Sequence, residues 1–143
     1  MNVEQILRRK GDWVATIRPD ATVGEAVDRL NRERIGALVV SGDGEGIDGV
    51  LSERDIVIGL REYRDNLLAA PVSDIMSRVV VTCDRGDDVG ELMAEMTNRR
   101  IRHFPVVTDG RLAGIVSIGD LVKSRLDEVE FEAHSLRSFI AGG

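Results

Sequence analysis

The sequence is poor in aromatic residues, cysteine, histidine and proline. Aromatic residues make up 3% of its 143 residues, and there are one cysteine and three prolines. A single cysteine excludes an internal disulfide and a cysteine-based zinc site, and two histidines as far apart as His103 and His134 argue against a histidine-rich metal site. Few aromatics beside 15 glycines favour an aliphatic core in a small α/β protein over a sandwich built on aromatic anchors.

Positive charge is also in deficit, and no long apolar run occurs. A formal net charge of −6 and a pI near 5.0 argue against a general attraction to nucleic acid or to an anionic membrane. No apolar stretch approaches the roughly 18 residues of a membrane span, and residues 1–5 lack the hydrophobic region of a signal peptide. We therefore expect a cytoplasmic protein without a metal site and with neither nucleic acid nor a membrane as partner.

What the sequence does contain is an internal repeat. Sliding the chain along itself aligns residues 23–25 with 89–91, 34–35 with 100–101 and, after a change of one residue in the glycine-rich stretch 42–46, 49–52 with 114–117 and Asp55 with Asp120. The matches keep their order and spacing through the whole unit, which chance explains poorly. The chain is therefore interpreted as two copies of one motif.

Each copy is predicted to run strand, helix, strand, strand, helix. The helices that open near Thr22 and Asp88 carry N-terminal capping residues, with Glu25 and Glu91 three positions on. The expected strands are 14–17, 37–40 and 47–51 in the first copy and 79–82, 103–107 and 112–116 in the second, with closing helices from Ser52 and Ser117. Copies of roughly 60 residues bury little surface alone, so we expect an α/β (α+β) fold in which two βαββα repeats pack through their sheets with pseudo-twofold symmetry.

The chain then divides into four segments. Residues 1–66 form the first repeat with an N-terminal helix, 67–71 the linker, 72–126 the second repeat, and 127–143 an extension of the last helix. Pro71 is placed to open a short helix over 72–76. The extension continues a heptad-like apolar stripe that could pack on its own domain or on a partner subunit: Val122, Leu126, Val129, Ala133, Leu136 and Ile140.

Chemistry is most concentrated where each copy repeats Ser-x-x-Asp at a strand-to-helix junction. Ser52 with Asp55, and Ser117 with Asp120, fit simple helix N-capping. The same junction also attracts a phosphate to the helix N-terminus, while an aspartate can accept hydrogen bonds from ribose hydroxyls. The two roles are compatible.

These residues resemble a known family, the tandem CBS (cystathionine-β-synthase) domain pair or Bateman module. The resemblance covers roughly residues 3–126 and depends on the Gly-x-x-Ser-x-x-Asp endings and on Arg102-His103-Phe104-Pro105-Val106-Val107. Short bacterial stand-alone pairs are the most similar members. The resemblance implies binding of AMP, ADP or ATP in clefts between the copies, no catalysis by the pair, a disc-like homodimer, and signalling through a separate, unknown protein.

Carried onto this sequence, the resemblance implies two clefts. One would be formed by Ala15, Ile35, Gly36, Ala37, Arg102, His103, Ile115, Ser117, Gly119 and Asp120. The other would be formed by Val50, Ser52, Arg54, Asp55, Val81, Ile101, Arg102 and His103. The aspartates would hold the ribose, the aliphatic residues the adenine, and Arg54, Arg102 and His103 the phosphates. The copies differ where Val39 stands opposite Pro105 and where Gly36-Ala37 stands opposite Arg102-His103, so phosphate-binding charge is concentrated on one side.

Three other functions stay open on the sequence, one of them an unrecognised enzyme. An NAD(H) sensor is possible because NAD(H) contains an AMP half, and a structural oligomerisation module with vestigial sites would need no ligand.

The basic run 99–103 could also be a solvated helix end. The Gly-x-Gly-x-x-Gly pattern at 44–49 precedes a strand rather than opening a helix, so we interpret it as a hairpin loop, and Cys83 as an inert structural residue. No catalytic residues are predicted.

Overall fold

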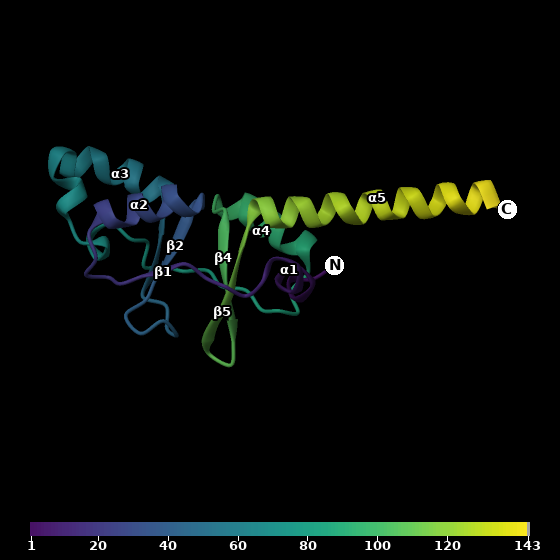
Figure 1. The fold of residues 1–143 in the computed structure, drawn as a ribbon, viewed down its shortest axis with the longest axis horizontal. Coiled ribbons are helices and arrows are strands. Elements are labelled where there is room, and N and C mark those ends of the chain that lie inside the picture. Colours follow the sequence, from purple (N-terminus) through teal and green to yellow (C-terminus); the bar gives the residue numbers. More distant parts are fainter. Residues whose placement is uncertain (143) are drawn as a thin grey trace.

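The helices begin at the predicted capping residues. The computed structural model describes residues 1–142. Thr22 accepts a hydrogen bond from the Glu25 amide at the start of α2, and Asp88 does the same for Glu91 at the start of α4. The elements in order are α1 (Val3–Lys10), β1 (Thr16–Ile17), α2 (Val23–Glu33), β2 (Ala37–Val40), β3 (Gly49–Ser52), α3 (Glu53–Tyr63), the 3-10 helices η1 (Arg64–Ala69) and η2 (Val72–Asp74), α4 (Val89–Arg99), β4 (His103–Thr108), β5 (Arg111–Ser117) and α5 (Ile118–Gly142). The two halves lie side by side (Figure 1).

The first repeat is built on a three-stranded sheet. Strand β1 pairs in parallel with β2, and β2 pairs antiparallel with β3. The amides of Val39 and Ser41 donate to the carbonyls of Ala15 and Ile17, which holds β1 in place. Aliphatic side chains fill this core, among them Leu30, Leu38 and Leu51. The expected α+β architecture of two repeats is confirmed.

The second repeat departs from the prediction, because no strand forms at residues 79–82. Its sheet contains only β4 and β5, and Val79 is 90% exposed. The position that Val39 holds in the first repeat is held here by Pro105, which has no N–H to donate toward residue 81. Backbone pairing of this segment with β4 is limited to Cys83, whose amide donates to the Pro105 carbonyl and whose carbonyl accepts from the Val107 amide, both at 3.0 Å.

Each repeat is completed by the segment that precedes the other one. Helix α1 comes first in the chain, yet Val3, Ile6 and Leu7 pack into the core of the second repeat with Phe104 and Val116. In return, Val72 and Met76, at the start of the segment 72–126, pack into the core of the first repeat. The backbone contacts match as well: Val3 N–H donates to Asp87 and Val89 N–H to Met1, as Val72 N–H donates to Ala21 and Val23 N–H to Ala70. This reciprocal exchange joins the two repeats around a pseudo-twofold axis.

The exchanged segments differ in length. The first forms the eight-residue helix α1, whereas the second forms only the 3-10 helix η2, so the helix expected over 72–76 is a single tight turn. Ahead of it, residues 64–69 form η1, and Leu67 is fully buried. The joining segment is therefore packed against the first repeat along much of its length.

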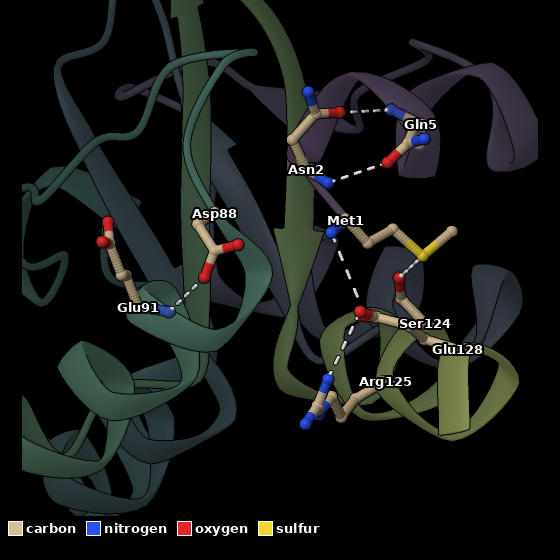
Figure 2. A network of polar contacts seen from close by, with 8 residues as sticks. All are labelled: Met1, Asn2, Gln5, Asp88, Glu91, Ser124, Arg125 and Glu128. Atoms are coloured by element: carbon tan, nitrogen blue, oxygen red, sulfur yellow. Dashed lines mark hydrogen bonds and ion pairs between the residues drawn. The ribbon is translucent and has the colours of Figure 1, made fainter. Parts of the chain in front are cut away.

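Met1 and the first turn of α1 lie against the start of α5 (Figure 2), and the Met1 carbonyl accepts from the Val89 amide at the start of α4. Asn2 and Gln5 form a reciprocal capping box, and the Ser124 hydroxyl lies 2.7 Å from the Met1 sulfur. The Met1 amino group lies 3.9 Å from Glu128, which also pairs with Arg125. These contacts fix one face of α5 against the second repeat.

Helix α5 then leaves the rest of the molecule. It runs for 25 residues, and its C-terminal half projects as a rod with no neighbouring element (Figure 1). The long final helix is thus confirmed. Within residues 1–142, no helix has the length and apolar character needed to cross a membrane.

Candidate functional site

A cleft of about 1140 Å³ opens at the seam between the repeats. One wall comes from β3 and α3 of the first repeat, and the other from the C-terminal end of α4 and the start of β4 in the second. Its lining residues are Gly36, Val50, Ser52, Glu53, Arg54, Asp55, Val57, Ile58, Ser77, Val79, Val80, Val81, Met96, Thr97, Arg100, Ile101, Arg102, His103, Pro105 and Ile118. The residues predicted around Asp55 all lie in this cleft, and their role in binding stays a prediction.

Asp55 is held rigidly at the start of α3. One carboxylate oxygen, Oδ2, accepts from the Ser52 amide at 2.8 Å and from the Ser52 hydroxyl at 3.0 Å. The other, Oδ1, accepts from the Ser77 hydroxyl at 2.8 Å. No cation pairs with this carboxylate among residues 1–142, and because Oδ1 accepts a single hydrogen bond it keeps a lone pair that a hydroxyl group of a ligand could approach.

Cationic side chains gather across the cleft from Asp55. Arg54 reaches from the first repeat to donate to the Arg100 carbonyl at 3.2 Å. Arg100 ends α4 in the left-handed conformation, which turns the chain toward Arg102 and His103. Arg99, in contrast, pairs with Glu95 one helical turn away, outside the cleft. The basic run therefore divides: Arg99 is a solvated helix end, and Arg100, Arg102 and His103 line the cleft.

His103 packs against the first repeat across the cleft. A Cβ atom on Gly36 would lie 3.3 Å from the His103 ring carbon Cε1, so the imidazole packs against the bare backbone of the first repeat. Burial lowers the pKa of His103 below its usual 6.5, although the nearby carboxylates of Asp120 and Glu53 act in the opposite direction. The ring is thus favoured in its neutral form in the folded protein.

Asp120 has the same local geometry as Asp55 but a different neighbour. It accepts from the Ser117 amide at 2.9 Å, as expected for the cap, and also from the Lys10 ammonium at 2.8 Å. Lys10 donates a second bond, to the Ile115 carbonyl. Burial would raise the pKa of Asp120, but the bonds from Lys10 and Ser117 outweigh it and lower the pKa below 3.8. A side chain of the protein therefore already occupies one acceptor position of Asp120, and the predicted role of Asp120 in ribose binding stays a prediction.

The other residues predicted around Asp120 do not gather in the open cleft. Gly36, Arg102 and His103 line the cleft that contains Asp55. Ala15 and Ala37 are buried in the first repeat, at 5% and 4% exposure. The remaining members, Ile35, Ile115, Ser117 and Gly119, are not lining residues of the cleft.

Some lining residues were missed by the sequence analysis. Ser77 is the clearest, since it bonds to Asp55 and its backbone pairs with Val50 on β3. It lies near the start of the segment 72–126, at a point where the two copies differ in length, so repeat alignment gives no signal for it. Thr97 and Arg100 were missed because they belong to the end of α4, which the sequence analysis treated as a helix surface.

The structure also shows the surroundings of Cys83 and of the glycine-rich stretch 44–49, neither of which was assigned a functional role from the sequence. Burial raises the pKa of the Cys83 thiol to about 12, so it stays protonated and unreactive. Residues 44–46 form a loop in which the Asp43 carboxylate accepts from the amides of Glu45 and Gly46. Among residues 1–142, no three His, Cys, Asp or Glu side chains are grouped so that they could hold a metal ion.

Comparisons with known proteins agree with this architecture. A family model described as the CBS domain matches residues 14–62 and 72–127. The mitochondrial CBS domain-containing protein CBSX3 of Arabidopsis thaliana is 32% identical over 152 residues, covering 99% of this chain and 72% of that protein. A crystal structure of a CBS-domain-containing protein from Agrobacterium tumefaciens has a TM-score of 0.85 and 42% identity, covering 87% of this chain and 99% of that one.

One further solved structure contains ligands. The CBS domain pair of protein MJ0100 was crystallised in complex with 5′-methylthioadenosine and S-adenosyl-L-methionine. It is 26% identical to this chain with a TM-score of 0.75, and the match covers 88% of this chain and 98% of that one.

Proposed function

The chain belongs to the CBS-domain family, and from that premise we propose that it is a non-catalytic regulatory module that binds AMP, ADP or ATP in the cleft beside Asp55. CBS-domain pairs are commonly regulatory ligand-binding modules. The observation that carries the proposal is the cleft itself: one carboxylate without a paired cation faces arginines across an aliphatic floor.

Each part of an adenine nucleotide has a matching part of the cleft. The aliphatic side chains of Val50, Val81 and Ile101 would enclose the adenine ring, since no Phe, Tyr or Trp side chain is among the lining residues. Asp55 would accept hydrogen bonds from the ribose hydroxyls. Arg54 and Arg102 would hold the phosphates, because guanidinium groups pair bidentately with phosphate oxygens. The adenosine-containing ligands of the MJ0100 domain pair support this ligand class.

The Asp120 cleft is proposed as a second, weaker site. A ligand there would have to displace Lys10 from Asp120 and from the Ile115 carbonyl before its ribose could bind. The displacement has a free-energy cost that the Asp55 cleft does not impose. We therefore expect one nucleotide per chain at low ligand concentration.

Regulation would follow from contacts that cross the seam. Arg54 bonds to the Arg100 carbonyl, and His103 packs on Gly36, so the relative position of the repeats is coupled to the residues that line the cleft. A ligand that binds one arrangement more tightly shifts the population toward it. We propose that a separate protein in the cytoplasm reads this change from a homodimer of the module.

The test is calorimetric titration of the chain with AMP, ATP, NADH and S-adenosylmethionine. AMP or ATP is expected to bind once per chain. Asp55→Ala should weaken binding about 10- to 100-fold, since it removes charged hydrogen-bond acceptors. Asp120→Ala is the matched control and should leave the first site unchanged. Because Asp55 also caps α3, Asp55→Asn serves as a second variant, and circular dichroism verifies that both remain folded.

Each other outcome has a definite meaning. No binding by any of the four compounds would leave a structural oligomerisation module. Tight NADH binding beside weak AMP binding would make the protein a redox sensor, with the second phosphate and ribose along Arg54 or Arg102. Loss of the first site in Asp120→Ala but not in Asp55→Ala would place the ligand in the wrong cleft for this proposal.

A further inference from the structure

Helix α5 presents an apolar stripe that its own chain leaves uncovered. The α5 stripe consists of Val122, Leu126, Val129, Ala133, Leu136 and Ile140. Its large members are 39% to 69% exposed: Val122 39%, Leu126 57%, Val129 45%, Leu136 60% and Ile140 69%. The C-terminal half of α5 projects away from the two repeats (Figure 1), and the exposed stripe residues of that half leave a partner subunit as the other position that the sequence allowed.

The stripe lies on the face of α5 opposite the one used within the chain. Leu121 and Ser124 are buried against the second repeat, while Asp127 pairs with Arg9 at 2.6 Å and Glu128 contacts Met1. If Leu126 is placed at heptad position a, these own-chain residues occupy positions b, c and f, and the α5 stripe occupies a and d. The face that a coiled coil needs is therefore available without disturbing the second repeat.

We infer that the α5 stripe pairs with the α5 stripe of a second copy of this chain in a parallel two-stranded coiled coil. Spacings that alternate between three and four residues over Val122–Ile140 keep one seam facing a partner helix. The charges beside the seam select both the partner and its direction. They fall at positions g and e, which face each other across a parallel dimer.

In a parallel pair, each g residue faces the e residue five positions later on the partner. Arg125 then faces Glu130 of the second copy, and Glu132 faces Arg137. Both complete g-to-e pairs are oppositely charged, and symmetry doubles each of them. The sequence thus satisfies the parallel arrangement at every position where such a pair can form within the stripe.

An antiparallel pair would set like charges against each other. Full overlap of the stripe places Leu126 opposite Leu136 and brings e against e and g against g. Glu130 then faces Glu130, Glu132 faces Glu132, and Lys123 faces Arg137. The charge pattern therefore rejects the antiparallel arrangement and favours two copies with their repeats at the same end.

The first experiment is sedimentation equilibrium over a wide range of protein concentration. The wild-type chain should change reversibly between monomer and dimer masses. Leu136→Asp, which places a charge in the seam, should weaken the dimer more than about 100-fold. Phe131→Asp is the matched control: Phe131 is 71% exposed on the same helix but lies off the seam, so dimerisation should persist. Both side chains are exposed in the monomer, so neither substitution removes core packing.

Charge exchange tests the direction of the helices. Glu132→Arg places an arginine opposite Arg137 of the second copy, twice by symmetry, and should weaken the dimer about tenfold. Adding Arg137→Glu should restore the dimer.

A disulfide then determines the orientation, using Leu136→Cys with oxidised glutathione as oxidant. Two such cysteines meet in the parallel pair but lie about 15 Å apart along the axis in the antiparallel one. Cys83 is buried and does not compete.

Four results would overturn the inference. These are a chain that stays monomeric at millimolar concentration, a dimer that Leu136→Asp leaves intact, a trimer or larger assembly, and disulfide formation only when Leu136→Cys is mixed with Leu126→Cys. The inference does not depend on nucleotide binding. A chain that dimerises through α5 without binding any nucleotide would refute the proposed function alone, and a monomer that binds AMP would refute this inference and the homodimer of the proposed function while leaving nucleotide binding in place.

Discussion

Two aspartates at equivalent positions, Asp55 and Asp120, have nearly identical local structures and different availability to a ligand. Each caps a helix, and each accepts from the amide of the serine three residues before it, at 2.8 and 2.9 Å. Asp55 faces an open cleft and bonds to the Ser77 hydroxyl, whereas Asp120 is paired with the Lys10 ammonium. A repeated motif therefore determines the cap, but it does not determine whether the cap can bind anything else.

The difference comes from the exchanged segments rather than from the motif. Helix α1 runs eight residues and brings Lys10 to Asp120. The corresponding segment of the other half is the 3-10 helix η2, which ends at Asp74 and is followed closely by Ser77. One half thus delivers a cation to its aspartate, and the other delivers a neutral hydroxyl. The length of the exchanged segment, rather than the repeated motif, therefore determines which aspartate is paired with a cation and which faces the open cleft.

The largest expected difference between the halves concerns the equivalent glycines Gly49 and Gly114. A Cβ at Gly49 would lie 2.8 Å from the Ser77 carbonyl oxygen, and that backbone is pinned by two hydrogen bonds with Val50. A Cβ at Gly114 would lie 2.8 Å from a methyl group at the end of the Leu7 side chain, which can rotate away. Gly49→Ala should lower the free energy of unfolding by about 3 kcal/mol and Gly114→Ala by about 1 kcal/mol.

Urea denaturation followed by circular dichroism measures both values. Gly110→Ala would not be a suitable control because Gly110 has a φ of 75°. Gly86→Ala is suitable, because nothing lies within 4 Å of its added Cβ, and it should leave stability close to wild type. Equal losses at Gly49 and Gly114 would mean that the Ser77 backbone yields as easily as the Leu7 side chain, and that the two halves do not differ in rigidity.

Much of this fold follows from the sequence, but the exchange does not. The capping residues Thr22 and Asp88 and the Ser-x-x-Asp pairs mark helix starts through short-range hydrogen bonds, which depend only on neighbours in the chain. That α1 packs on the second repeat depends on how apolar surfaces fit at long range. Val3, Ile6 and Leu7 show that α1 has a buried face, yet not which core it joins.

The missing strand at 79–82 could have been predicted in part. The sequence analysis noted that Pro105 stands where the first copy has Val39, and a proline inside a sheet removes one donor from the ladder. The apolar run of Val79, Val80 and Val81 outweighed this signal in the pattern. The same run becomes a wall of the cleft.

The Lys10–Asp120 ion pair provides a second way to compare the two halves, through the dependence of stability on pH. Lys10→Met should lower the free energy of unfolding at neutral pH by about 0.5 to 1 kcal/mol, because the pair is only partly buried. The folded-state pKa of Asp120 lies below 3.8, so the contribution of this carboxylate is present above that value and is lost as pH falls through the folded pKa. Wild type and Lys10→Met should therefore converge in strongly acidic solution.

Thermal unfolding at a series of pH values checks this convergence. Arg9→Met is the matched control, since the Arg9–Asp127 pair joins the same two helices but is more exposed, at 48% and 39%. It should have a smaller effect at neutral pH. A gap between wild type and Lys10→Met that persists unchanged at acid pH would show that Lys10 stabilises the protein by packing alone, and Asp120 would no longer be distinguished from Asp55 by its ion pair.

The smallest expected effect concerns His103, whose counterpart in the first repeat is Ala37. Burial against Gly36 lowers the pKa of His103 in the folded protein, and the charges around the ring are Asp120 and Glu53, which raise it, and Lys10 and Arg102, which lower it further. The unfolded chain therefore binds a proton more readily than the folded one between pH 6.5 and the folded pKa. Stability should be complete above pH 6.5 and should fall by a few tenths of a kcal/mol or more as pH decreases through that window.

The chemical shifts of the imidazole protons, assigned with the help of His103→Gln, should give a titration midpoint below 6.5. The same substitution should flatten the dependence of stability on pH. Because Lys10 contributes to the shift, Lys10→Met should move the midpoint upward, which links the imidazole at the open cleft to the ion pair that fills the closed one. A midpoint that Lys10→Met leaves in place would show that the two sites titrate independently, and the contrast between Asp55 and Asp120 would then be purely local.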